Sequence, residues 1–246
     1  MKKEYIVFFS LYRVFLEIDA LQSLIKGRNR ELLELFYINF TNMVFEKKDD
    51  KKLKDLVSLM KSYSKLEKIE IFNNFTFDDH LENRLNSDIK NALTLFYQAI
   101  SLYTEHKKNL TNEELEIVTK RQIDDFLNRI ISNEIDLTIT PKRYGILYQA
   151  LIEFNNALSH IFNALIKRQP TNNFKRAISH FHRGALDILK TIIKDLILLQ
   201  KINVEDIFEY RKIEYFYIGN EETKRTTIIQ NYLKIIRDLN STTNRL

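Results

Sequence analysis

The chain has 246 residues and a formal net charge of +5, and it contains only 4 Gly, 2 Pro, no Cys and no Trp. At average usage about 17 Gly and about 12 Pro would be expected, so β-sandwiches, barrels and glycine-loop nucleotide sites are poorly supported. The absence of cysteine excludes disulfide frameworks and thiolate metal sites. Hydrophobic residues make up 44% and charged residues 29%, which is typical of a globular chain.

Apolar residues recur at helical spacing along nearly the whole sequence. The predicted helices are residues 5–25, 31–45, 53–72, 81–106, 112–131, 141–168, 174–199, 204–218 and 221–239. The only alternating segment, 136–140, is short and ends at Pro141. We therefore predict an all-α fold, a bundle of about nine helices without a sheet. The bundle forms either one continuous domain or two regions, 1–135 and 136–246.

Local signals indicate where several helices begin and end. Thr111 and Glu114 have the spacing of a capping box, in which each side chain bonds the backbone N–H of the other residue. Pro141 suits the first position of a helix, where a missing N–H costs nothing. The charged run 46–52 and the segment 170–173, with its proline and two asparagines, are predicted to be turns.

No segment reaches about 18 uncharged apolar residues, so neither a transmembrane helix nor a membrane partner is expected. The apolar run 5–12 follows N-terminal lysines, as in a signal peptide. However, Glu4 precedes the run, Arg13 ends it, and no small-residue cleavage site follows. We expect a cytoplasmic protein.

The positive charge is concentrated in the C-terminal part of the chain. Residues 141–246 contain 17 Lys and Arg against 10 Asp and Glu, whereas residues 1–140 contain 21 against 23. An excess of this kind favours an anionic partner such as nucleic acid, and an ordinary solvated surface is the alternative.

Two consecutive predicted helices each carry a polar stripe beside the apolar one. The stripes consist of Gln149, Glu153, Asn156, His160 and Asn163 on the first helix, and of Arg176, His180, Arg183 and Asp187 on the second. Steps of three and four residues place each stripe on one helix face. A short connection makes the helices antiparallel neighbours, with His160 level with His180 and Glu153 level with Asp187. The stripes then face each other or both face away, and the sequence leaves this choice open.

Facing stripes would permit three roles. The histidines and arginines could cleave a phosphodiester, because imidazole moves a proton while guanidinium stabilises the developing charge. A metal site made by the two histidines with Glu153 and Asp187 is disfavoured, since each acid lies about 10 Å along the axis from the histidine of its own helix. The third role is an interhelical network without chemistry. We predict no resident metal or cofactor.

The segment 210–217 mixes Arg211 and Lys212 with tyrosine and phenylalanine. Such a mixture could stack bases and contact phosphates. A helix that packs its aromatic side chains inward is the commoner arrangement.

The stretch Arg176-Ala-Ile-Ser-His180-Phe-His182 resembles the Arg-x4–6-His motif of HEPN-type ribonucleases, small all-helical proteins common in toxin–antitoxin, CRISPR-linked and antiviral systems. Arg176 and His182 have the required spacing, whereas Arg176 and His180 are one residue too close but share a helix face. The resemblance covers only residues 174–200, and Ala177 stands where the family often has a polar residue. It implies metal-independent RNA cleavage, in a homodimer, with His182 or His180 as the acid–base group and Arg176 holding phosphate.

Together these observations predict a cytoplasmic RNA-cleaving protein, and the resemblance suggests antiviral defence as its role. The catalytic candidates are Arg176, His180 and His182, and the substrate-binding candidates are Asn156, His160, Arg183, Arg211 and Lys212. The alternative is a non-enzymatic helical scaffold or sensor, which binds a protein or nucleic-acid partner through its basic C-terminal region.

Overall fold

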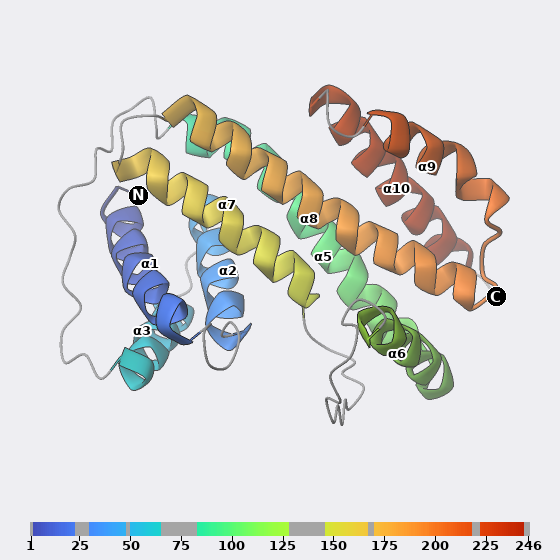
Figure 1. The fold of residues 1–246 in the computed structure, drawn as a ribbon, viewed down its shortest axis with the longest axis horizontal. Coiled ribbons are helices and arrows are strands. Elements are labelled where there is room, and N and C mark those ends of the chain that lie inside the picture. Colours follow the sequence, from blue (N-terminus) through green and yellow to red (C-terminus); the bar gives the residue numbers. More distant parts are fainter. Residues whose placement is uncertain are drawn as a thin grey trace. The chain divides into compact units, whose positions relative to one another are not determined.

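The structure is a computed structural model, and it describes residues 2–22, 30–47, 50–64, 83–127, 146–166, 170–217 and 222–243 (Figure 1). Within these ranges all regular structure is helical and no strand occurs, which confirms the predicted all-α fold. The described elements are nine α-helices and one π-helical segment: α1 (Lys2–Gln22), α2 (Arg30–Val44), α3 (Asp50–Ser64), η1 (Leu85–Ile89), α5 (Lys90–Asn109), α6 (Asn112–Leu127), α7 (Tyr148–Ile166), α8 (Pro170–Leu198), α9 (Glu205–Tyr217) and α10 (Glu222–Thr243).

Two helices end at a residue with left-handed backbone that is not glycine. Glu46, after α2, has φ 57°, and Gln200, after α8, has φ 56°. In each case the next N–H bonds a carbonyl five residues back, from Lys47 to Asn42 at 2.8 Å and from Lys201 to Leu196 at 2.9 Å. These are Schellman motifs, which satisfy the last carbonyls of a helix. The turn predicted for the charged run is therefore correct at Glu46, but the run's last three residues, 50–52, already belong to α3.

The capping box at the start of α6 is confirmed. The backbone N–H of Glu114 donates to Thr111 Oγ1 at 3.1 Å, and the backbone N–H of Thr111 donates to Glu114 Oε2 at 2.9 Å. Lys201 adds an ion pair to the same carboxylate, with Nζ 2.7 Å from Glu114 Oε1. The carboxylate thus caps α6 and also forms an ion pair with Lys201, three residues beyond the end of α8.

The predictions made from the two prolines need correction. Residues 170–173 do not form a turn but the first turn of α8, which begins at Pro170. Proline is favoured there, because its fixed φ suits a helix and its missing N–H has no partner to lose. The helix predicted from Pro141 begins only at Tyr148, and the two preceding residues, 146 and 147, are not helical. Gly145 lies between proline and helix in the sequence, and glycine opposes helix by about 1 kcal/mol; Pro141 itself lies outside the described residues.

The chain divides into two compact units, Met1–Tyr97 with Tyr148–Gly184, and Gln98–Leu147 with Ala185–Leu246. Helices α5 and α8 contribute residues to both. The boundary predicted between residues 135 and 136 lies outside the described residues. Among the described ranges, none of the helices combines the length and the hydrophobicity that a bilayer crossing requires.

The core of the first unit contains a cluster of aromatic rings among its aliphatic side chains. In this unit α2 lies against α1, α3 and α7. The buried rings that contact one another come from α1, α2, α5, α7 and α8: Phe8, Phe9, Tyr12, Phe15, Phe36, Tyr37, Phe40, Phe96, Phe154, Phe162 and Phe181. Tyr12 also donates its hydroxyl hydrogen to Asn155 Oδ1 at 2.8 Å, which ties α1 to α7. The many Phe and Tyr of the sequence therefore supply a large part of this core.

Gly184 allows α8 to approach α5 and α7 closely. A Cβ atom at this position would lie 2.5 Å from Phe96 Cε2 and 3.2 Å from Glu153 Cβ. Because Phe96 is fully buried among other rings, it has little room to move aside. The glycine therefore sets how closely α8 meets the helix that carries Glu153.

The second unit encloses a buried ionic cluster that the sequence did not indicate. Asp195 of α8 is fully buried and contacts three basic side chains from α5 and α6. The distances are 3.3 Å to His106 Nε2, 3.4 Å to Lys107 Nζ and 2.8 Å to Arg121 Nη2. Burial lowers the pKa of Lys107, and the charge of Asp195 partly offsets this effect. The cluster joins three helices, and through it His106 of α5 bonds α8.

Candidate functional site

Helices α7 and α8 bring the two polar stripes together. Within the first unit they run side by side in opposite directions (Figure 1). Each buries an apolar stripe, which includes Leu151, Phe154 and Leu158 on α7 and Phe174, Ala177 and Phe181 on α8. The polar stripe of each helix lies beside this buried face, and it is therefore carried to the edge of the hairpin where the two helices meet.

The two stripes face each other, which answers the question that the sequence left open. The rings of His160 and His180 are stacked, with centroids 5.2 Å apart and planes inclined by 18°. The two histidines are therefore in contact across the hairpin. His180 also contacts Glu153 of α7.

Glu153 bonds His180 rather than the residue that we predicted to lie level with it. His180 Nδ1 donates to Glu153 Oε2 at 2.6 Å, and Arg183 Nη1 lies 3.7 Å from Oε1 of the same carboxylate. Asp187 forms an ion pair with Lys190 on its own helix, at 3.2 Å. The two hydrogen bonds place His180 beside Glu153 and His160 beside Asn173, so the predicted register, with Glu153 level with Asp187, is wrong.

The site is only partly open to solvent. The Glu153 side chain is 6% exposed and the His180 side chain 18% exposed, whereas Arg183 is 59% exposed. The buried carboxylate therefore fixes the imidazole through a strong charge-assisted bond. The arginine, at longer distance and in solvent, is held loosely and can turn toward a ligand.

His160 is held in the same way from the start of α8. Its Nδ1 donates to Asn173 Oδ1 at 3.2 Å. Burial lowers the pKa of His160, and the positive charges of His180 and Arg176 lower it further, while the bond to Asn173 opposes them. His160 is therefore neutral at pH 7, and the lone pair of its other ring nitrogen, Nε2, can accept a proton.

The sequence of the hairpin has an excess of basic residues. Residues 148–184 contain five basic side chains and a single acidic one, Glu153. The basic residues are Lys167, Arg168, Lys175, Arg176 and Arg183. Of these five, Lys175, Arg176 and Arg183 belong to α8, while Lys167 and Arg168 lie outside the described residues. A surface of this composition attracts anions.

Among the remaining candidates, Asn156 lies on the polar stripe of α7, whereas His182, Arg211 and Lys212 lie elsewhere. His182 is buried on α8, about 200° around the helix from His180, and so points away from the stripe. Asn156 is half-buried on α7. Arg211 and Lys212 belong to α9 in the second unit, where they pair with Glu214 and Glu209 respectively.

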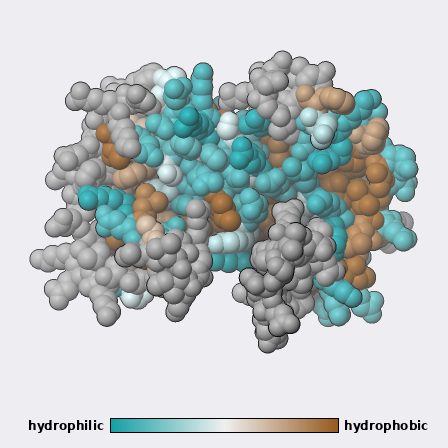
Figure 2. All heavy atoms as spheres, viewed as in Figure 1, coloured by the Kyte–Doolittle hydropathy of each residue, from teal (hydrophilic) through white to brown (hydrophobic). Residues whose placement is uncertain are grey.

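The aromatic residues at the end of α9 do not pack inward, contrary to the commoner arrangement. Tyr215 is 86% exposed and Phe216 is 68% exposed. Phe208, about two turns earlier on the same helix, is also exposed. Figure 2 shows hydrophobic surface over the end of α8 and over α9. Among the described residues of this helix with described side chains, only Ile207 and Glu214 are buried.

The described residues contain no group of three or more His, Cys, Asp or Glu side chains placed to hold a metal ion. No family model matches the chain, and neither the curated proteins nor the solved structures include a significant match to it.

Proposed function

We propose that the α7–α8 hairpin is a metal-independent RNA-cleaving site of the HEPN kind, in a cytoplasmic protein that acts in antiviral defence. The observation that carries the proposal is the pair of stacked histidines, each bonded through Nδ1 to a side chain of the opposite helix. Both Nε2 atoms remain on the side chains' outer ends for chemistry, and two arginines accompany them. Orientation by a bonded partner is how hydrolytic enzymes fix the tautomer of a catalytic histidine.

The geometry suggests complementary roles for the two histidines. His160 is neutral at pH 7, and its Nε2 takes the proton of a ribose 2′-hydroxyl. The oxygen attacks the adjacent phosphorus, and the 5′-oxygen leaves with a proton from His180 Nε2. Arg176 and Arg183 stabilise the negative charge that builds up on the phosphoryl oxygens. The products are a 2′,3′-cyclic phosphate and a 5′-hydroxyl.

The test is cleavage of a labelled single-stranded RNA by the purified protein in the presence of EDTA. We expect cleavage by the parent protein and a loss of about 100-fold or more in His180→Ala and His160→Ala, since acid–base groups contribute about 10² to 10⁴ in rate. Glu153→Gln should reduce the rate less, because the amide still holds the ring. Arg176→Ala should weaken cleavage, whereas Lys175→Ala, which removes a neighbouring exposed charge, should not.

The proposal fails if the parent protein, shown to be folded by circular dichroism, does not cleave RNA. It also fails if His180→Ala and His160→Ala cleave at the parent rate, since the activity would then belong to a contaminant or to another site.

The exposed aromatic end of α9 favours a second candidate function, a non-enzymatic scaffold or sensor that binds nucleic acid. Tyr215 and Phe216 lie exposed near Arg211 and Lys212 on the same helix, as in surfaces that stack bases. The test is RNA binding by fluorescence anisotropy. Replacement of both aromatic residues by Ala should weaken binding, while His180→Ala should leave it unchanged.

A further inference from the structure

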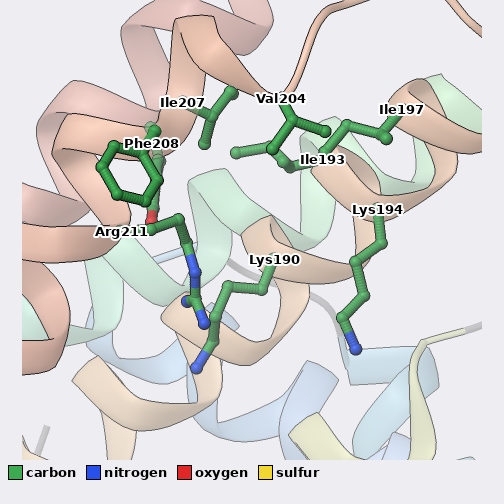
Figure 3. A pocket seen from close by; sticks show the side chains of 9 residues that line it. Lys190, Ile193, Lys194, Ile197, Val204, Ile207, Phe208 and Arg211 are labelled. Carbon is green, nitrogen blue, oxygen red and sulfur yellow. The ribbon is translucent and has the colours of Figure 1, made fainter.

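The second unit contains a cavity that the proposed RNA-cleaving site does not use. It encloses about 200 Å³ between α8, α9 and α10 (Figure 3). The lining residues are Lys190, Ile193, Lys194, Ile197, Val204, Ile207, Phe208, Arg211 and Tyr232. All of them belong to the same unit, so the cavity is formed within one compact body.

The lining is divided into an apolar side and a cationic side. Figure 3 shows Ile193, Ile197, Val204 and Ile207 gathered on one side, with the Phe208 ring next to them. The ends of Lys190 and Arg211 lie beside each other on the opposite side, and Lys194 extends in the same general direction. The lining contains three cationic side chains and no acidic one. An occupant that matches it needs an apolar body and a negative charge at one end.

A buried carboxylate behind the lining fixes the two neighbouring cations. Glu214 is buried, forms an ion pair with Lys190 at 3.0 Å and accepts a hydrogen bond from Arg211. Lys190 Nζ also lies 3.2 Å from Asp187 Oδ1 on its own helix. The hydroxyl of Tyr232 donates to the Glu214 carboxylate at 3.0 Å. Burial, together with the charge of Glu214, raises the pKa of Tyr232, so that this hydroxyl keeps its hydrogen. The cationic side is therefore preorganised before any ligand arrives.

The apolar side is open at its rim. Val204 and Phe208 are both more than half exposed although they line the cavity. Exposed apolar side chains next to a cavity mark binding sites more often than scattered ones do. A ligand that covered them would remove this area from water.

We propose that this cavity binds a small carboxylate with an unbranched or singly branched apolar body of about eight carbon atoms. The size follows from proportion, since an apolar cavity of about 150 Å³ holds one benzene molecule. The apolar body lies against Ile193, Ile197, Val204 and Ile207, and the carboxylate faces Lys190 and Arg211. This binding function goes beyond RNA cleavage and does not depend on it.

The test is a titration of the isotope-labelled protein with octanoate, followed by the methyl NMR signals of the cavity isoleucines. We expect saturable shifts that are confined to the cavity. 1-Octanol and octylamine have the same apolar body without the negative charge, and they should bind at least about tenfold more weakly. An increase in ionic strength should weaken the binding of octanoate but not that of 1-octanol.

Two exposed positions allow variants that leave the fold intact. Val204→Phe fills the cavity from its rim and should weaken octanoate binding by at least about tenfold. Lys194→Glu reverses one charge of the lining and should weaken it by about fivefold or more. Lys120→Glu, an exposed substitution on α6 outside the lining, makes the same change in net charge and should have no effect.

Equal binding of octanoate and 1-octanol would overturn the proposal, because the cations would then play no part. Octanoate shifts that persist in Val204→Phe would overturn it as well. N-acetylphenylalanine mimics the carboxyl terminus of a protein, which is the other source of an apolar carboxylate. If it binds more tightly than octanoate, the cavity is a peptide-docking site and the proposal is wrong.

Discussion

Single buried acids organise several ionic clusters among the described residues, and Glu153 and Asp195 are two of them. Glu153 is the sole acidic residue of the basic hairpin, and it contacts both His180 and Arg183. Asp195 receives three basic side chains. Removing a carboxylate from water costs free energy, and only the charged partners around it compensate for this loss. The charges of these two residues therefore matter more than those of any exposed pair.

His160 should make the stability of the fold depend on pH. Its folded-state pKa lies below the value of about 6.5 expected in the unfolded chain. Between these two values the unfolded state binds more protons, so the free energy of unfolding falls as pH decreases below about 6.5. In His160→Gln this contribution is lost, and the profile between pH 7 and pH 5 should be flatter. Urea unfolding across this range measures the effect, and parallel profiles would contradict it.

Asp195 should be among the most sensitive positions to substitution. Asp195→Asn leaves the buried Lys107 without its counter-charge and should lower the free energy of unfolding by about 3 to 5 kcal/mol. Asp187→Asn is the control, because Asp187 is half-exposed on the same helix and also pairs with a lysine. Its effect should stay within about 1 kcal/mol. Similar losses in the two variants, measured in urea, would show that burial is not decisive.

At the scale of helices, the scarcity of glycine affects the helix ends. Glu46 and Gln200 occupy left-handed positions where glycine has no steric penalty, and other residues pay about 1 to 2 kcal/mol. Both side chains are exposed, so nothing else holds them in this conformation. The chain thus forms Schellman motifs at a cost in stability that substitution can remove.

Gln200→Gly should therefore stabilise the protein by about 0.5 to 1 kcal/mol, in spite of the greater freedom of glycine in the unfolded chain. Gln200→Ala keeps the left-handed penalty and serves as the control, for which no gain is expected. Thermal unfolding followed by circular dichroism distinguishes the two. A gain with Ala as large as that with Gly would mean that the glutamine side chain, and not the backbone, is unfavourable.

Gly184 should tolerate no side chain. The Cβ of Gly184→Ala would meet the edge of the Phe96 ring, and the resulting overpacking costs about 1 to 3 kcal/mol, more than the helix propensity that alanine gains. Phe96→Leu removes the ring edge. The double variant should therefore lose less stability than the sum of the single variants, and strictly additive losses would contradict the contact.

The sequence predicted elements where the signal was local. The capping box of Thr111 and Glu114 needs only four consecutive residues, and it formed as expected. The turn predicted at Pro170 was wrong, because proline is as favourable in the first turn of a helix as in a loop. The spacing predicted that His160 and His180 lie at similar heights, but the exact register and the choice between facing and opposed stripes depend on how the two helices pack. Asp195 could not be identified, because its partners are 74 to 89 residues away in the sequence.

At the scale of the molecule, the candidate site is assembled within one chain. The two histidines, the acid and Arg183 all meet inside the first unit. In the proteins that the Arg-His stretch resembles, the motif usually meets its copy across a homodimer. A chain that supplies both histidines itself has no need of a second copy for the chemistry, whatever its oligomeric state.

Mixing two inactive variants tests this point. If the site is complete in one chain, a mixture of His160→Ala and His180→Ala, unfolded and refolded together, should not regain RNA cleavage. A composite site would regain up to about a quarter to a half of the parent rate, because mixed dimers would contain one intact pair. Light scattering on the same samples establishes whether dimers are present.

The exposed end of α9 also offers a chemical handle. With no cysteine and no tryptophan in the chain, reagents that modify those side chains have no target. Tyr215 is the most exposed of the tyrosines whose side chains the structure describes. Mild nitration should therefore begin there and place a coloured, titratable phenol on α9, whose absorbance would change when a base or any other flat ligand stacks against it.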